Sequence, residues 1–207
     1  MHFGENNTWI NINSDLISEY SAIYDTYDID DEMIEYALDK NERAHMEYNR
    51  RTKTLVVIYN VLNLSREENH YDTIPLTFVV RQNQIVTISN SLNEYIIDQI
   101  REELEENMHW SVFNFLLHSL FAISENYFPV IEKLNKEQQK ISQLLRKKTT
   151  KDNLFRLSDL EIEGMYLVSA TKQNAVVLEQ LKTQQAFKAL DDSEREQLED
   201  NIIEANQ

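Results

Sequence analysis

Apolar and uncharged residues recur at alternating steps of three and four between residues 110 and 148. They are Trp110, Phe113, Leu117, Leu120, Ser124, Tyr127, Ile131, Leu134, Gln138, Ile141 and Leu145. This spacing predicts one helical seam facing a partner helix, and the helix would be ~55–60 Å long at about 1.5 Å per residue. Because a compact domain cannot bury such a helix, we expect its far half to project. Pro129 lies inside the pattern and should kink it.

Two more helical stretches are predicted after this one. A polar break at residues 147–151 precedes a looser seam, formed by Leu157, Leu160, Leu167, Ala175, Leu178 and Leu181. Two long helices joined by a short polar turn make an antiparallel hairpin. Gly164 is then expected at a close-packing position between them. A last helix begins near Leu190, with a narrow seam of Leu198, Ile202 and Ile203.

The pattern before residue 109 mixes strands and helices. Strands are predicted at residues 8–12, 46–49, 52–62, 76–80 and 85–88, from alternating or continuous apolar runs. Helical spacing is found at residues 16–24, 33–38 and 92–104, the last of these capped by Ser91. We therefore divide the chain into an α/β unit, residues 1–108, with helices packed on a central sheet, and a helical part, residues 109–207.

Composition narrows the possible functions. The 207 residues include two glycines and two prolines, which favours helix, and no cysteine, which excludes disulfides and zinc–thiolate sites. The net charge of −16 disfavours nucleic-acid binding and makes divalent cations natural partners, although an acidic surface can also be simply solvated. The polar first eight residues predict no signal peptide. The longest apolar patch, residues 112–123, is shorter than the ~20 residues of a membrane span, so the chain as given is predicted to be soluble.

The hairpin tip is an exception to the acidic composition. Its bases are Lys133, Lys136, Lys140, Arg146, Lys147, Lys148, Lys151 and Arg156, which outweigh Glu132, Glu137 and Asp152. Two interpretations stay open for this cluster. It is either a solvated hairpin tip or a surface that lies near anionic lipid headgroups.

No motif of a hydrolase, a transferase or a zinc enzyme is present, so the sequence predicts no enzyme. Glu106 and His109 have the spacing used in di-iron bundles, but such sites need a second copy that the chain lacks. His118 is expected to pack in a helix seam or to bond a backbone group. Mg²⁺ keeps several waters and needs only one or two carboxylates per site. Acidic residues on different subunits could therefore share a hydrated ion and form a two-state sensor.

Four segments, in the same order, resemble the CorA magnesium transporter family. Residues 34–48, IEYALDKNERAHMEY, are similar to its acidic stretch ED-x-L-D-x-x-E-R-P-R-x-E, and residues 76–80 with 85–88 resemble its hairpin. Residues 125–134, ENYFPVIEKL, are similar to the start of its peripheral "willow" helix pair. Residues 196–204, EQLEDNIIE, resemble the upper part of its long stalk helix. The likeness covers nearly the whole chain.

The resemblance implies an α+β fold: an α/β/α sandwich with a mixed central sheet, then a long antiparallel helical hairpin and the start of a stalk helix. It implies a homopentameric divalent-cation channel at the cell membrane, with this part on the cytoplasmic side. The transmembrane segment would follow Gln207, and the abrupt end of the last helix fits this expectation. Carried over by position, Glu35 and Asp200 would hold Mg²⁺ between subunits. Tyr36 stands where a second acid is usual, so the site would be weaker, absent, or relocated to Asp39 or Glu32.

The expected function is therefore the regulatory domain of a CorA-like transporter that senses cytosolic Mg²⁺, or a related ion such as Co²⁺ or Zn²⁺, and gates the channel. Two alternatives stay open at this point. One is the corresponding domain of a zinc-transporting relative. The other is a soluble acidic adaptor that dimerises through its helical hairpin.

Overall fold

A mixed β-sheet organises the computed structural model, in which residues 1–67, 70–184 and 190–206 are described. The strands are β1 (His2–Phe3), β2 (Asn7–Asn13), β3 (His45–Asn49), β4 (Thr54–Glu67), β5 (His70–Arg81) and β6 (Gln84–Ser89). Their spatial order among the described residues is β1-β2-β6-β5-β4-β3. The β2–β6 pair is parallel and the other pairs are antiparallel, which confirms the predicted mixed sheet.

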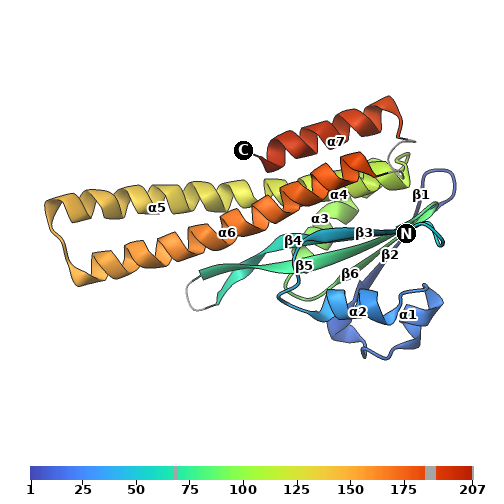
Figure 1. Ribbon diagram of the computed structural model, residues 1–207, viewed down its shortest axis with the longest axis horizontal. Coiled ribbons are helices and arrows are strands. Elements are labelled where there is room, and N and C mark those ends of the chain that lie inside the picture. The colour runs from blue at the N-terminus through green and yellow to red at the C-terminus, as the bar shows by residue number, and fades with distance from the viewer. Residues whose placement is uncertain (68–69, 185–189, 207) are drawn as a thin grey trace.

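Helices cover both faces of this sheet, as expected for an α/β/α sandwich (Figure 1). Along β5, Phe78 and Val80 contribute to one core and Val79 to the other, because neighbouring strand residues point to opposite faces. The smaller core includes residues of α1 (Ala22–Thr26) and α2 (Asp31–Leu38). The larger core includes residues of α3 (Glu94–Glu106), α4 (Val112–Glu125), α5 (Tyr127–Lys147), α6 (Lys151–Thr183) and α7 (Asp192–Ala205).

Pro75 is tolerated inside this sheet because of its place in the register. It lies beyond Thr77, which pairs with Ile88 at the end of the β5–β6 ladder, so the missing N–H costs no bond to β6. The Pro75 carbonyl instead accepts a hydrogen bond of 3.2 Å from Asn93 Nδ2. Opposite Pro75 on β4 is Asn60, which lies beyond the last β3–β4 pair. Its backbone therefore needs partners from outside the sheet.

Asn174 of α6 supplies those partners. Its Oδ1 accepts from the Asn60 N–H, and its Nδ2 donates to the Asn60 carbonyl, both at 2.9 Å. The same carbonyl accepts from the Tyr127 hydroxyl at 2.9 Å. Gln173 Oε1 accepts from the backbone N–H of Ala44 at 3.2 Å, just before β3. The base of the helical hairpin is thereby hydrogen-bonded to the unpaired edge of β4.

The hairpin is formed by α5 and α6 and projects from the sheet, as predicted (Figure 1). The expectation of one helix kinked at Pro129 is wrong in position, because the helix stops at Asn126 and restarts at Tyr127. Pro129 is the third residue of α5. Backbone N–H groups in the first turn of a helix have no partner within it, so proline costs least there. The Asn126 side chain supports the break by donating to the Ala122 carbonyl at 2.7 Å.

Two further predictions of local structure are wrong. The helical spacing of residues 16–24 yields only the 3₁₀ turn Ser14–Leu16 and the short α1, and Leu16 and Tyr20 are 80% and 88% exposed. Ser91 does not cap α3, whose N-cap is Asn93. The Ser91 hydroxyl and backbone N–H instead donate to Asp15 Oδ2 at 2.5 and 2.8 Å. Hydrogen bonds to a distant segment decided the Ser91 case, whereas the lack of a surface for Leu16 and Tyr20 to pack on decided the other.

The last helix, α7, begins with a capping box in which Asp191 and Glu194 bond each other's backbone N–H groups. It packs on α4, where Asn201 Nδ2 donates to the Leu117 carbonyl at 2.7 Å. Leu198 is buried as predicted, whereas Ile203 is 59% exposed and lies outside the seam. The larger core is continuous from β1 to α7, and the division of the chain at residue 108 stays a prediction.

Candidate metal-binding residues

Glu35 lies on the exposed side of α2. This helix begins at the N-cap Asp30, whose Oδ1 accepts from the Met33 N–H at 3.0 Å. Ile34 and Ala37 pack into the smaller core, and this fixes the rotation of the helix about its axis. Glu35 is consequently directed to solvent, where its carboxylate is accessible to a cation or to another chain.

Tyr36, next to Glu35, occupies the place where an acid was expected. Its hydroxyl contacts Glu32 Oε1 at 3.0 Å and Glu47 Oε1 at 3.2 Å. The hydrogen bond to Glu32 is the largest cause that raises the pKa of Tyr36 to about 12, and burial and Glu47 add to it. The ring also packs edge-on against His45, with the ring centroids 4.8 Å apart. Tyr36 is therefore a neutral bridge between two carboxylates.

Glu47 was not singled out from the sequence. It lies on the edge strand β3, and the alternation of that strand places it on the exposed side. Only the position of α2 beside β3 brings Glu47 close to Tyr36. Of the two proposed replacement ligands, Glu32 accepts from Tyr36, and Asp39 Oδ1 accepts from the Asn41 N–H at 2.9 Å.

Asp200 lies on α7, on the side facing away from the rest of the chain. Leu198 and Asn201 are buried against the larger core, so Asp200 is directed outward and is exposed. Its neighbour Glu199 forms an ion pair with Lys182 of α6 at 3.2 Å. Both predicted ligands are thus free of the core and accessible on the surface.

A single chain does not bring Glu35 and Asp200 together. α2 covers one face of the sheet and α7 belongs to the opposite layer (Figure 1). Within the described residues, no group of three or more His, Asp or Glu side chains is arranged to hold a metal ion. The pair can share an ion only if the two residues come from different chains. Its role in metal binding stays a prediction.

The helical Glu106–His109 pair is not formed. α3 ends at Glu106, and His109 lies in the following turn, so the two side chains do not share a helical face. His118 packs in the helical layer, as expected. Its ring stacks on Trp110 with centroids 4.1 Å apart and planes 5° apart, and burial lowers its pKa.

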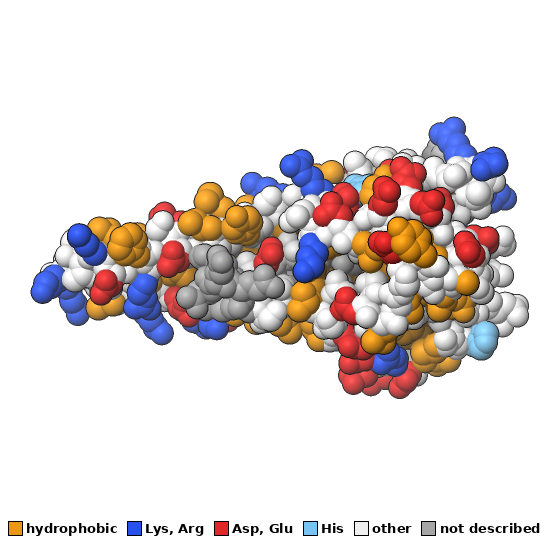
Figure 2. All heavy atoms as spheres, turned by 90° about the horizontal axis from the view of Figure 1, so that it is seen from below, with side chains coloured by type: hydrophobic (Ala, Val, Ile, Leu, Met, Phe, Trp, Pro, Cys, Tyr) orange, Lys and Arg blue, Asp and Glu red, His pale blue; other side chains and the backbone are white. Residues whose placement is uncertain are grey.

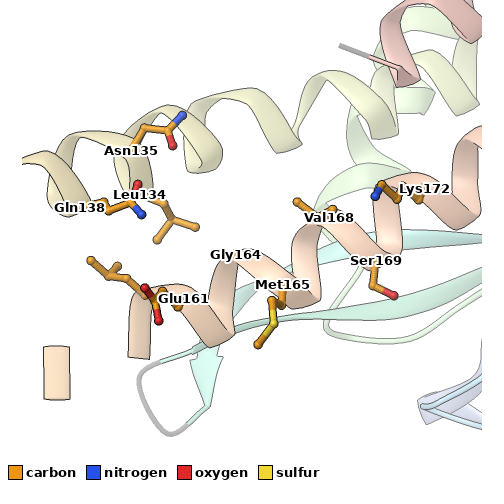
Figure 3. A pocket seen from close by; sticks show the side chains of 10 residues that line it. Leu134, Asn135, Gln138, Glu161, Gly164, Met165, Val168, Ser169 and Lys172 are labelled. Carbon is orange, nitrogen blue, oxygen red and sulfur yellow. The ribbon is translucent and has the colours of Figure 1, made fainter. Parts of the chain in front are cut away.

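A groove runs between α5 and α6. It has a volume of about 750 Å³, and Leu134 of α5 points across it toward α6 (Figure 3). Gly164 lines this groove, and a Cβ at that position would contact nothing within 4 Å. The prediction that Gly164 allows close helix packing is therefore wrong. Glu161 is the one carboxylate in the lining, which is a poor donor set for a divalent cation.

None of the helices in the described parts of the chain has both the length and the apolar character that crossing a bilayer requires. In fold, the chain is a mixed α/β sandwich with a projecting helical hairpin. The CorA-like Mg²⁺ transporter protein family matches residues 4–207, and the chain belongs to this family. No curated protein matches it in sequence.

Solved structures of CorA and ZntB proteins share this fold. The complete CorA magnesium transporter of Methanocaldococcus jannaschii aligns with a TM-score of 0.81 at 18% identity, covering 98% of this chain and 63% of that chain. The soluble domain of the same protein aligns with a TM-score of 0.78 at 19% identity, covering 96% and 79%. The ZntB cytoplasmic domain of Vibrio parahaemolyticus gives 0.68 at 10% identity, covering 98% and 84%. This chain therefore spans less than two thirds of the complete transporter.

Proposed function

We propose that this chain is the cytoplasmic regulatory domain of a CorA-like Mg²⁺ transporter, and that it senses the cation and gates a homopentameric channel. One observation carries the proposal: the family match spans residues 4–207, and the soluble domain of a CorA magnesium transporter aligns with 96% of the chain. The role is regulation of transport, not catalysis. The membrane-spanning part would belong to the remainder of the transporter.

The proposed sensor is a hydrated Mg²⁺ held between neighbouring subunits by Glu35 and Asp200. Both carboxylates are exposed and lie on opposite layers of one chain, which suits ligands that face different neighbours in a ring. Without the ion, a chain with a net charge of −16 repels its copies. A cation that binds only the closed assembly would shift the population toward it. With Tyr36 in place of an acid, we expect this site to be weak.

Magnesium titration of the wild-type chain and an Asp200→Ala variant tests the sensor. We expect millimolar Mg²⁺ to raise the melting temperature and the sedimentation coefficient of the wild type, because a ligand that binds only the folded assembly stabilises it. Asp200→Ala should lose most of both effects. Asp192→Ala is the matched control, because it removes the same charge from α7 at a fully exposed position. No effect of Mg²⁺ on the wild type, or an equal effect on Asp200→Ala, would refute the sensor.

A zinc-transporting function is the second candidate, since the ZntB cytoplasmic domain aligns with 98% of the chain. The available donors favour Mg²⁺. The chain has 36 Asp and Glu residues, five His and no Cys, and carboxylate oxygens suit Mg²⁺ whereas imidazole and thiolate suit Zn²⁺. The same titration with Zn²⁺ separates the two ions. A larger stabilisation by Zn²⁺ than by Mg²⁺ at equal concentration would favour the zinc relative.

A further inference from the structure

The outermost part of the helical hairpin, residues 140–156, is a narrower tip than the predicted one and has the opposite charge from the rest of the molecule. Six bases are exposed on it, against one acid, Asp152: Lys140, Arg146, Lys147, Lys148, Lys151 and Arg156. Within the described residues, none of these six cations forms an ion pair. In Figure 2, Lys and Arg side chains prevail at the narrow end of the molecule, whereas most of the visible Asp and Glu side chains lie on the broad end, which also bears some Lys and Arg.

Helix-end electrostatics explains only part of this cluster. Arg146 and Lys147 lie in the last turn of α5, where cations complement the partial negative charge of a helix C-terminus. Lys151 is the first residue of α6, where a cation is unfavourable for the same reason. The stability of the hairpin therefore does not explain a base at that position, whereas an external anion would.

Exposed apolar side chains lie among the same cations. Leu144 is 46% exposed, Leu154 49% and Phe155 66%. Orange hydrophobic atoms accordingly lie beside the blue ones at the narrow end in Figure 2. Lysine and arginine mixed with leucine and phenylalanine are typical of surfaces that enter the headgroup region of a bilayer, where the apolar groups leave water and the cations meet lipid phosphates.

The length of the hairpin lets the tip act independently of the acidic part of the molecule around the β-sheet. Ile141 is the one buried residue in the outer part of α5, and no residue of α6 before Glu163 is buried, so the tip stands clear of the core. A hairpin that projects ~20–30 Å at 1.5 Å per residue exceeds the ~8 Å Debye length at physiological ionic strength. An anionic surface at the tip is therefore screened from the acids on the sheet layer.

We propose that this tip docks on the surface of an anionic lipid bilayer, with the cations on lipid phosphates and Leu144, Leu154 and Phe155 in the headgroup region. The apolar residues favour lipid over nucleic acid, whose phosphate backbone offers leucine nothing to bury against. They also favour lipid over the acidic head of a second copy. The docking adds a membrane contact made by the hairpin itself.

Vesicle flotation measures this contact directly. The wild-type chain should bind vesicles of phosphatidylcholine and phosphatidylglycerol in equal parts, should not bind pure phosphatidylcholine vesicles, and should dissociate at high salt. Each cation near such a surface contributes about fivefold in affinity. The variant Lys148→Gln/Lys151→Gln/Arg156→Gln should therefore bind on the order of 100-fold more weakly.

Two matched controls test whether the effect comes from the position of the substitutions at the tip or only from the change in charge or hydrophobicity. Arg50→Gln/Arg51→Gln/Lys53→Gln makes the same change in net charge at the exposed turn after β3 and should bind like the wild type. Leu154→Ser/Phe155→Ser should weaken binding about tenfold or more. Met165→Ser/Val176→Ser changes residues of α6 with similar exposure, 65% and 54%, and should not weaken it.

Several results would overturn the proposal: no flotation of the wild type, equal binding to neutral vesicles, or equal losses in the tip variants and their controls. A melting temperature for each variant excludes loss of folding as the cause. Self-association of the wild type at low salt, abolished by the tip variant and without vesicle binding, would identify a second copy as the partner instead. The vesicle experiments are done without Mg²⁺, so their outcome does not depend on whether the proposed Mg²⁺ sensor is correct.

Discussion

Asn174 is a buried amide that replaces a missing strand. Beyond the end of β3, the edge of β4 presents the N–H and carbonyl of Asn60 to the interior, and Asn174 bonds both. Buried backbone groups without partners are costly, which explains a polar residue at 2% exposure on the largely apolar buried face of α6. The same two bonds hold α6 in register with the sheet.

Replacing Asn174 with alanine should therefore destabilise the chain by about 2 kcal/mol, because the Asn60 N–H loses its partner while remaining buried. Urea unfolding followed by circular dichroism gives the change as a lower midpoint with an unchanged slope. Gln180→Ala, at an exposed position of α6, is the control and should stay within ~0.5 kcal/mol of the wild type. Equal midpoints for the two variants would contradict the role assigned to Asn174.

The sequence predicted which residues form the candidate site, but not how they are arranged in space. Helical spacing gives the side of α2 and α7 on which Glu35 and Asp200 lie, and both are exposed. Which elements meet is decided by long-range packing that spacing does not contain. This is why Glu47, contributed by β3 to the Tyr36 hydroxyl, escaped the sequence analysis, and why Gly164 was assigned to a close contact although it lines an open groove.

At the scale of elements, the two glycines have opposite roles. Gly164 lies inside α6 with free space around it, where glycine costs backbone entropy without a steric reason. Gly4 has a φ of +55°, and a Cβ there would lie 2.6 Å from Asn7 Nδ2 and 2.9 Å from the Trp110 carbonyl oxygen. The first position should accept alanine, and the second should not.

Gly164→Ala should raise the free energy of unfolding by about 0.5–1 kcal/mol. Gly4→Ala should lower it by about 1–2 kcal/mol, since an L-residue is strained at positive φ. Urea unfolding of both variants beside the wild type is sufficient, and each serves as the control for the other. A loss of stability in Gly164→Ala would mean that the groove is closed by a partner or by a different packing of α5 and α6.

Most elements followed from apolar periodicity. The continuous run in β4, the strands of the β5–β6 hairpin, and the seams of α3 and α6 are all where the spacing placed them, because each buries a face large enough to dominate its local preference. The helix predicted at residues 16–24 does not form, for the converse reason. Leu16 and Tyr20 continue the helical spacing but find no surface to pack on, so the pattern has no energetic consequence there.

At the scale of the whole molecule, burial declines along the hairpin. Near the sheet, Leu167, Ala170, Leu178 and Leu181 of α6 are buried in the larger core. Toward the tip, Leu154 and Phe155 are about half exposed or more. The end of each long helix near the sheet is thus held by tertiary packing and by hydrogen bonds to Asn60, from Asn174 in α6 and from Tyr127 in α5. The other end depends on its partner helix alone.

Hydrogen exchange should report this gradient. Amides of residues 142–160 are expected to exchange through local opening, at free energies well below that of global unfolding, whereas amides of residues 167–181 and 112–123 should exchange only near the global limit. Mass spectrometry of peptides from the two regions measures the difference in one experiment on the wild-type chain. Adding anionic vesicles should slow exchange at the tip and leave residues 112–123 unchanged. If, without vesicles, the tip is protected as well as residues 167–181, the outer hairpin is held by contacts that a single chain does not provide. Loss of that protection on dilution would then identify them as contacts between copies.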